Sequence, residues 1–103
     1  MAKFRLTNRA VEDLTSIWNY TLEKWSEKQA DKYYNLLVDN FNEIARNPRL
    51  GKNYSDVVEN IFGFRVGRHI IFYRQVQDRE IEVIRILHEQ MDLKDRLKEK
   101  KPT

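Results

Sequence analysis

Apolar residues along this chain follow two different periods, which divide it into helices and strands. Phe4 and Leu6 alternate with Lys3 and Arg5, and this alternation predicts a short first strand. Apolar residues then recur every three or four positions, as they do on one face of an amphipathic helix. We therefore expect a helix after the first strand. Its apolar stripe consists of Ala10, Leu14, Ile17, Trp18, Leu22 and Trp25.

The break at Trp25-Ser26-Glu27 predicts a second helix that starts at about Glu27. Ser26 followed by Gln29 fits a capping box, in which the hydroxyl accepts the amide three residues later. Asn47-Pro48 predicts the end of this helix, because the residue before a proline is pushed out of helical geometry. Two helices with almost no linker must fold back as an antiparallel hairpin. The second stripe consists of Ala30, Tyr33 or Tyr34, Leu37, Phe41, Ile44 and Ala45.

From Ile61 onward the pattern is typical of extended chain. β-branched and aromatic residues predict strands over residues 61–66, 69–76 and 80–87. Tight turns at residues 67–68 and 77–79 make these strands a meander. Residues 49–60 form a polar connector. The tail from His88 to Thr103 is expected to form a short amphipathic helix that frays over about residues 98–103.

The order of these elements predicts an α+β fold, β-α-α-β-β-β, with a helical hairpin packed on one face of a mostly antiparallel sheet. One hairpin covers only one face, yet both faces of the sheet are predicted to be apolar. Either the chain's own tail or a partner must cover the second face, and the pattern favours neither. In the middle strand Ile70, Phe72 and Val76 point one way, and Ile71 and Tyr73 the other. In the last strand Ile81, Val83 and Leu87 oppose Ile84 and Ile86.

The composition narrows the class of protein. A chain of 103 residues is expected to be a single domain over residues 1–103. The absence of cysteine excludes a disulfide scaffold, a thiolate metal site and a cysteine nucleophile. No apolar run approaches the roughly 20 residues that cross a bilayer, and the first residues lack an apolar signal core. We therefore expect a soluble cytoplasmic protein without membrane contact.

Positive charge is concentrated in the predicted meander. The formal net charge is +3, and no acid lies between Ile61 and Gln77. We find no recognised metal-ligand spacing, no glycine-rich phosphate loop and no nucleophile elbow, so we expect no metal and no cofactor. The remaining candidates for a functional surface on the sheet are Arg65, Arg68, His69, Tyr73, Arg74, Arg85 and His88.

Two interpretations of this cationic set stay open. It could cleave RNA without a metal, with His88 as acid or base and with Arg85 and Arg65 as cations for the phosphate. Alternatively, His69 is a polar residue at a strand end and His88 a capping residue. Arg85 lies inside an apolar strand, so it either pairs with an acid or faces a functional groove.

The two tryptophans, Trp18 and Trp25, lie seven residues apart on the first helical stripe. Most simply, both belong to the core of the hairpin. Trp25 lies near the helix end, so we also consider it available to a partner.

The sequence resembles the ParE toxins. The run Ala10-x-x-Asp13-Leu14-x-x-Ile17-Trp18-x-Tyr20-Thr21, followed by Trp25-x-x-x-Gln29-Ala30, resembles their first helix and hairpin turn. Asn47-Pro48-x-x-Gly51 resembles their helix exit. Gly67-Arg68-His69-Ile70-Ile71-Phe72-Tyr73-Arg74 and Ile84-Arg85-Ile86-Leu87-His88-x-x-Met91-Asp92 resemble their last two strands and the exit from the sheet. The likeness covers residues 3–97.

This resemblance implies the RelE/ParE fold and the toxin of a bacterial type II toxin–antitoxin module. It implies DNA gyrase as the target and a ParD-type antitoxin whose flexible part wraps the toxin. Folding on binding would bury apolar area and place acidic side chains against the arginines. The expected toxin is not an enzyme, and no direct sequence-specific contact with nucleic acid is expected.

Two other functions remain open. The RelE-like sister branch cuts ribosome-bound mRNA with basic residues and commonly a tyrosine or histidine near the C-terminus. Here only His88 occupies a comparable place. The third hypothesis is an antitoxin-bound remnant without toxicity.

Overall fold

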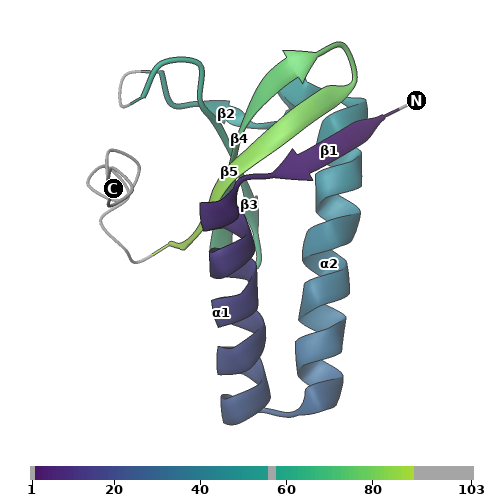
Figure 1. Ribbon diagram of the computed structural model, residues 1–103, viewed down its shortest axis with the longest axis vertical. Helices are drawn as coiled ribbons and strands as arrows, with labels where there is room; N and C mark the ends of the chain where they lie inside the picture. Colours follow the sequence, from purple (N-terminus) through teal and green to yellow (C-terminus); the bar gives the residue numbers. More distant parts are fainter. Residues whose placement is uncertain (1, 56–57, 90–103) are drawn as a thin grey trace.

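The computed structural model describes residues 2–55 and 58–89, and its elements follow the predicted order (Figure 1). Two elements were not predicted: a 3-10 turn, η1, and a short strand, β2, both within the polar connector. The two residues of β2 are too few to show a hydrophobic pattern. The expected helical tail and its fraying lie outside the described residues. The elements are β1 (Lys3–Leu6), α1 (Asn8–Lys24), α2 (Glu27–Arg46), η1 (Pro48–Leu50), β2 (Lys52–Asn53), β3 (Phe62–Val66), β4 (His69–Gln77) and β5 (Glu80–His88).

Side-chain caps define where both helices begin. The Thr7 side chain accepts a hydrogen bond from the backbone N–H of Ala10, at 3.1 Å. The Ser26 hydroxyl accepts from the N–H of Gln29, also at 3.1 Å, so the predicted start at Glu27 is confirmed. Such caps satisfy amide groups that have no partner within the first helical turn.

The five strands form one sheet in the order β1-β5-β4-β3-β2. β1 is parallel to β5, and every other neighbouring pair is antiparallel. The turn between β3 and β4 has Gly67 at φ +58°, and the turn between β4 and β5 has Arg79 at φ 58°. Gly67 is the first residue of its two-residue turn, and a positive φ at that position suits the turn types that match the twist of the flanking strands.

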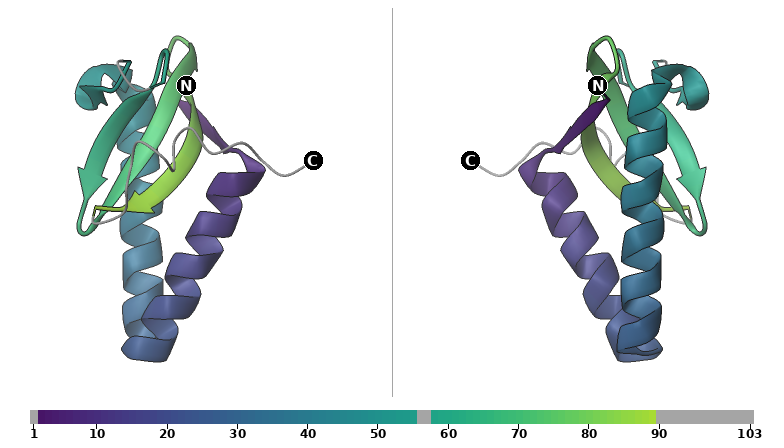
Figure 2. Two further views of the ribbon diagram at one scale, coloured as in Figure 1. Left: turned by 90° about the vertical axis from the view of Figure 1, so that its left-hand side faces the viewer. Right: turned by 90° about the vertical axis from the view of Figure 1, so that its right-hand side faces the viewer.

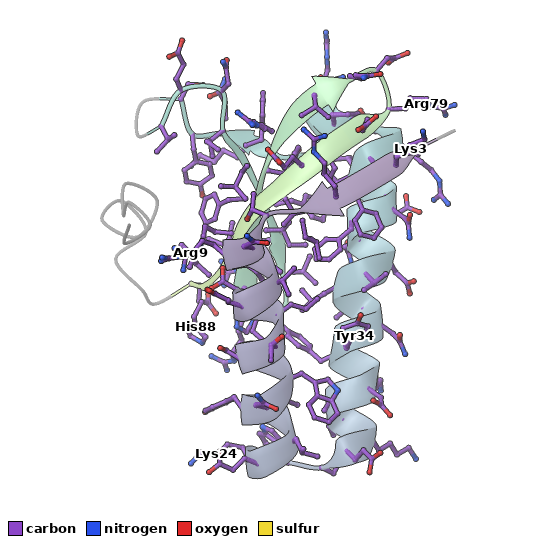
Figure 3. All side chains as sticks on the ribbon, in the orientation of Figure 1. Lys3, Arg9, Lys24, Tyr34, Arg79 and His88 are labelled. Atoms are coloured by element: carbon purple, nitrogen blue, oxygen red, sulfur yellow. The ribbon has the colours of Figure 1, made fainter. Side chains whose placement is uncertain are left out.

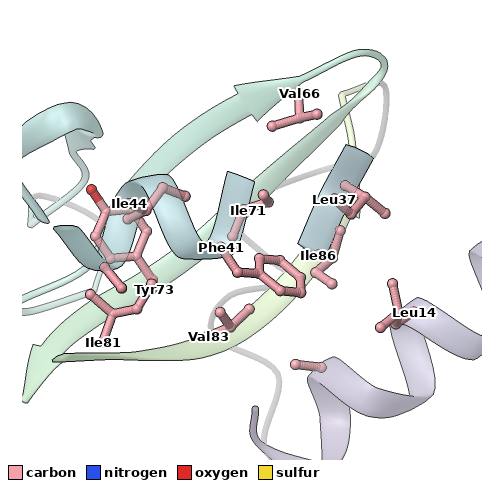
Figure 4. Packing of buried hydrophobic residues seen from close by; sticks show 12 residues of the cluster. Leu14, Leu37, Phe41, Ile44, Val66, Ile71, Tyr73, Ile81, Val83 and Ile86 are labelled. Carbon is pink, nitrogen blue, oxygen red and sulfur yellow. The ribbon is translucent and has the colours of Figure 1, made fainter. Parts of the chain in front are cut away.

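Both helices pack on one face of the sheet, as the pattern predicted (Figure 2). Phe41 lies at the centre of this layer (Figure 4). The centroid of its ring lies 5.2 Å from that of Phe4. The buried residues of this main core are Ala10, Leu14, Leu37, Phe41, Ile44, Ala45, Val66, Ile71, Tyr73, Ile81, Val83 and Ile86.

A β-bulge in β5 exchanges the faces of its last residues. Phe72 pairs with Arg85, whereas the next residue, Tyr73, pairs with Val83, so Ile84 is the extra residue on β5. The expectation that Leu87 shares a face with Ile81 and Val83 was therefore wrong. Ile86 lies in the main core instead, and Leu87 and Ile84 lie with Phe72 on the second face.

The second face carries a smaller core, built on Ile61, Ile70, Phe72 and Leu87. Tyr54 and Val58 of the connector pack against it, and the Tyr54 ring makes an edge contact with Phe72 at 5.2 Å. Gly63 leaves room for this contact, since a Cβ there would lie 2.7 Å from Tyr54 Cε1. We had expected the tail or a partner to cover this face, but the connector contributes part of the cover.

The far end of the helical hairpin extends beyond the sheet (Figure 1). Leu22 is 39% exposed and Trp25 is 74% exposed, so the predicted stripe is not buried along its whole length. The cause is geometric: past the sheet, each helix has only the other helix to pack against. The interpretation of Trp25 as a hairpin core residue was wrong.

Candidate functional site

The predicted cations and histidines do not all lie together. Arg65 on β3, Arg68 in the following turn, and Arg85 on β5 lie near one end of the sheet with the two histidines. His69 and His88 face each other across β4 and β5, with ring centroids 5.3 Å apart in an edge arrangement. We call these five residues and Tyr33 the histidine cluster. His88 is labelled beside α1 in Figure 3.

Tyr33 of α2 joins this cluster, although the sequence pattern placed it only on a helical stripe. Its hydroxyl oxygen lies 2.7 Å from Nδ1 of His69 and 3.2 Å from the carbonyl oxygen of Val66. Both bonds form if Nδ1–H donates to the hydroxyl oxygen and the hydroxyl donates to Val66. Burial raises the pKa of Tyr33. No sequence signal distinguished Tyr33 from Tyr34, because only the packing decides which ring points to the sheet.

His69 is neutral at physiological pH. Burial, and next the proximity of His88, lower the pKa of His69 to about 4, while Asp13 and Glu89 act in the opposite direction. Burial lowers a histidine pKa because the charged imidazolium loses hydration. His69 is therefore an anchor between α2 and the sheet rather than a cation for a phosphate.

We expect His69 to make the folded state sensitive to mild acid. Its pKa is about 4 when folded, below the ordinary value of about 6.5, so the unfolded chain binds the proton more readily in this window. The free energy of unfolding should fall by on the order of 2 kcal/mol as the pH drops from about 6.5 to about 4. Urea denaturation of wild type and His69→Gln across this range isolates the effect. Equal pH slopes in both proteins would contradict the assignment.

Arg85 pairs with an acid, which was one of its two predicted alternatives. Its Nε lies 2.8 Å from Oδ2 of Asp13, and a second guanidinium nitrogen lies 3.1 Å from Oδ1. The side chains are only 11% and 15% exposed. Asp13 also accepts the backbone N–H of Ile86 at 2.9 Å. Asp13 thus ties α1 to β5 beside the bulge, a role that the sequence did not reveal.

The other arginines differ in their surroundings. Arg65 is exposed and forms an ion pair with Glu89. Arg68 is exposed in the turn and has no ion pair within the part of the chain that the structure describes. Arg74 lies elsewhere, on the second face, where its guanidinium is 2.8 Å from Glu82, a carboxylate shared with Arg5 at 3.3 Å. Arg74 therefore does not belong to the histidine cluster.

Tyr73 and Trp25 also lie apart from this cluster. Tyr73 is fully buried; its hydroxyl donates to the carbonyl of Pro48 at 2.6 Å and accepts from the N–H of Gly51 at 2.8 Å. The structure thus places Tyr73 in the core and not on the surface where we expected it. Trp25 is exposed and directly follows Lys24, the last residue of α1, which Figure 3 shows at the tip of the hairpin, away from His88.

The helical hairpin carries most of the large apolar side chains exposed among the described residues, whereas the sheet was expected to present them. Such side chains, outside any core, favour contact with another macromolecule. The exposed set is Val11, Tyr20, Leu22, Tyr34 and Leu36 on the helices, Trp25 in the turn between them, and Leu50 on η1.

A shallow groove of about 340 Å³ lies beside β2 and β3. It combines apolar walls with Lys52 and Arg65, and so suits a chain with apolar and acidic side chains. Its lining residues are Leu50, Lys52, Tyr54, Gly63, Phe64, Arg65 and Ile70.

The residues considered for RNA cleavage all have partners in the protein: Arg85 pairs with Asp13, Arg65 pairs with Glu89, and the His88 ring contacts His69. Across residues 2–55 and 58–89, no three histidine or acidic side chains are grouped to hold a metal ion. In the same part of the chain, neither helix has the length and apolar character needed to cross a bilayer.

Solved structures share this fold of a helical hairpin on one face of a mostly antiparallel sheet. A chain of the chromosomal ParDE toxin–antitoxin system from P. aeruginosa superposes with a TM-score of 0.69 at 19% identity, covering 85% of this chain and 96% of that one. A chain of the RelBE2 toxin–antitoxin complex from Mycobacterium tuberculosis gives a TM-score of 0.63 at 21% identity, covering 84% and 96%. The fold class is that of chains found in toxin–antitoxin complexes.

The sequence model of a protein family, the ParE toxin of the type II toxin–antitoxin system parDE, matches residues 4–93 of this chain. Toxin ParE1 of Caulobacter vibrioides is 32% identical over 97 residues, covering 94% of this chain and 99% of that protein. Toxin ParE1 of Mycobacterium tuberculosis H37Rv is 30% identical over 92 residues, covering 89% and 94%. This chain belongs to the ParE family of type II toxins, as its resemblance implied.

Proposed function

We propose that this protein stops bacterial growth in the cytoplasm by binding DNA gyrase, without catalysis of its own, and that a ParD-type antitoxin neutralises it. The observation that carries the proposal is the set of exposed apolar side chains on the hairpin of a ParE-family toxin. Aromatic residues that stay exposed in a folded chain are frequent anchors of protein interfaces. Trp25 at the hairpin tip is the largest of them.

The histidine cluster adds positive charge to the exposed apolar side chains of the hairpin as a second surface for a partner. Arg65 and Arg68 are exposed, and we assign them to contacts with acidic side chains of a partner. Charged groups at the rim of an interface mainly raise the rate of association and set specificity, whereas buried aromatic anchors supply most of the affinity. The internal pairing of Arg85 and the anchoring of His69 support a role in holding the shape of this end of the sheet.

A gyrase assay with the purified protein tests the target. We expect inhibition of supercoiling or accumulation of cleaved DNA, and its reversal by a ParD-type antitoxin. Trp25→Ser should weaken inhibition about tenfold or more, since a hot-spot residue contributes about 2 kcal/mol. Lys24→Ser, at the neighbouring exposed position, is the matched control and should change it little.

Unchanged gyrase activity at protein concentrations that arrest growth would contradict the target. Transcript cleavage during expression that disappears in His88→Ala would favour the endoribonuclease instead. Harmless overexpression in a host with susceptible gyrase would favour the inactive remnant.

A further inference from the structure

The two histidines of the chain form a directly opposed pair where β4 begins and β5 ends. His69 is the register partner of His88. The N–H of Glu89 donates to the carbonyl of Arg68 at 2.9 Å, so the bond of the ladder lies between the residues that flank the pair. The two histidines are therefore a non-hydrogen-bonded pair, in which the side chains share one face and approach most closely.

The spacing of the two imidazole rings is that of two ligands on one zinc ion. Zinc lies about 2.0–2.1 Å from each imidazole nitrogen, and each ring centroid lies about 1.1 Å behind that nitrogen. Two rings on a tetrahedral ion therefore have centroids about 5.2 Å apart. The centroids of His69 and His88 are 5.3 Å apart, with the ring planes at 85°. To share an ion, the rings need only rotate about their side-chain bonds.

Tyr33 prepares His69 to act as a ligand. The hydroxyl of Tyr33 accepts from Nδ1–H of His69 at 2.7 Å when it donates to the carbonyl of Val66 at 3.2 Å. In that tautomer Nε2 of His69 carries no proton and offers a lone pair. Histidines that bind metals usually donate their other N–H to such a partner, which fixes the ring and its tautomer. His69 is also neutral at physiological pH, so a metal ion displaces no proton from it.

The nearby carboxylates are held by arginines. Asp13 binds Arg85 and the N–H of Ile86, and Glu89 pairs with Arg65. These pairs leave the surroundings close to neutral. They also explain why the described residues contain no group of three ligands. An ion at the two histidines would keep its other positions open to water.

We propose that His69 and His88 form a two-histidine site for a zinc ion. Imidazole nitrogen suits zinc, copper and nickel ions, whereas magnesium prefers oxygen. The bound ion would tie the start of β4 to the end of β5, beside the contact of α2 with the sheet. The spacing of the histidines along the chain does not indicate this site, because they meet only through the register of two strands. The proposal concerns the folded chain alone and does not depend on the target of the toxin.

A zinc titration of the full chain tests the site. We expect one ion per chain, with a dissociation constant below about 1 mM, and shifts of the ring resonances of both histidines in nuclear magnetic resonance spectra. Magnesium should cause neither effect. His88→Asn should weaken zinc binding at least tenfold, because it removes one of the two ligands. Asp78→Asn, in the turn at the other end of β4, removes an exposed carboxylate and should leave the affinity unchanged.

Tyr33→Phe tests the orientation of His69. This variant keeps both ligands but removes the acceptor of Nδ1–H, so zinc should bind about tenfold more weakly. Circular dichroism confirms that each variant folds. The proposal is overturned if the chain binds no zinc below about 1 mM, if magnesium reproduces the shifts, or if His88→Asn binds as tightly as wild type. An unchanged affinity in Tyr33→Phe would refute the role of Tyr33.

Discussion

Asp13→Ala is expected to lower the free energy of unfolding by about 3 kcal/mol, because it leaves the guanidinium of Arg85 without its carboxylate in a nearly buried place. The substitution also removes the acceptor of the Ile86 N–H, at the bulge where β5 changes its register. Urea denaturation followed by circular dichroism measures the loss. Exchange of the Ile86 amide should become faster in the variant.

Two further variants separate the charge from the hydrogen bond. Asp13→Asn keeps an acceptor for Ile86 but removes the negative charge, so it should be destabilised less than Asp13→Ala. In the double variant Asp13→Ala/Arg85→Met the unpaired charge is gone, and part of the lost stability should return. A loss below about 1 kcal/mol for Asp13→Ala would show that water or another group replaces the carboxylate.

Phe41→Ala is expected to lower the free energy of unfolding by about 4 kcal/mol, because it empties the centre of the main core. The ring of Phe41 is fully buried and contacts Phe4 of β1, so its loss loosens α2 from the edge strand. Chemical denaturation provides the measurement. Leu36→Ala is the matched control, since Leu36 lies on the same helix but is 43% exposed.

Leu36→Ala should lower the free energy of unfolding by less than about 1 kcal/mol, as most substitutions of surface residues do. A similar loss in Phe41→Ala and Leu36→Ala would mean that the hairpin does not pack on the sheet as described. A large loss in Phe41→Ala alone would confirm that this residue anchors α2 over β1 and β5.

Rules that involve only neighbouring residues were sufficient to predict the helices. The cap at Ser26 and the proline after Asn47 act within a few residues, so the pattern located both ends of α2. Four of the five strands, β1, β3, β4 and β5, were recognised as easily, because β-branched and aromatic residues cluster between turn residues there. Interpretation failed where the partner of a residue lies far along the chain.

The bulge and the site show this limit most clearly. Nothing near Ile84 in the sequence indicates an extra residue, because the bulge is defined by the register with β4 and by the carboxylate of Asp13, 73 positions from Ile86. Tyr33 and His69 are 36 positions apart and meet only when α2 crosses the sheet. The exposure of Trp25 depends on how far the hairpin extends past the sheet, which a helical stripe does not specify.

By itself, the sequence determined the order of helices and strands, the faces of the first elements and the likeness to ParE toxins, because local propensity, capping and periodicity are properties of neighbouring residues. Only the tertiary structure decided that Arg85 pairs with Asp13, that Tyr73 is buried, and that β1 ends the sheet with an open edge. These features depend on which distant segments become neighbours. That choice is made by the packing of the whole chain, since the favourable energy of burial and ion pairing appears only once the segments meet.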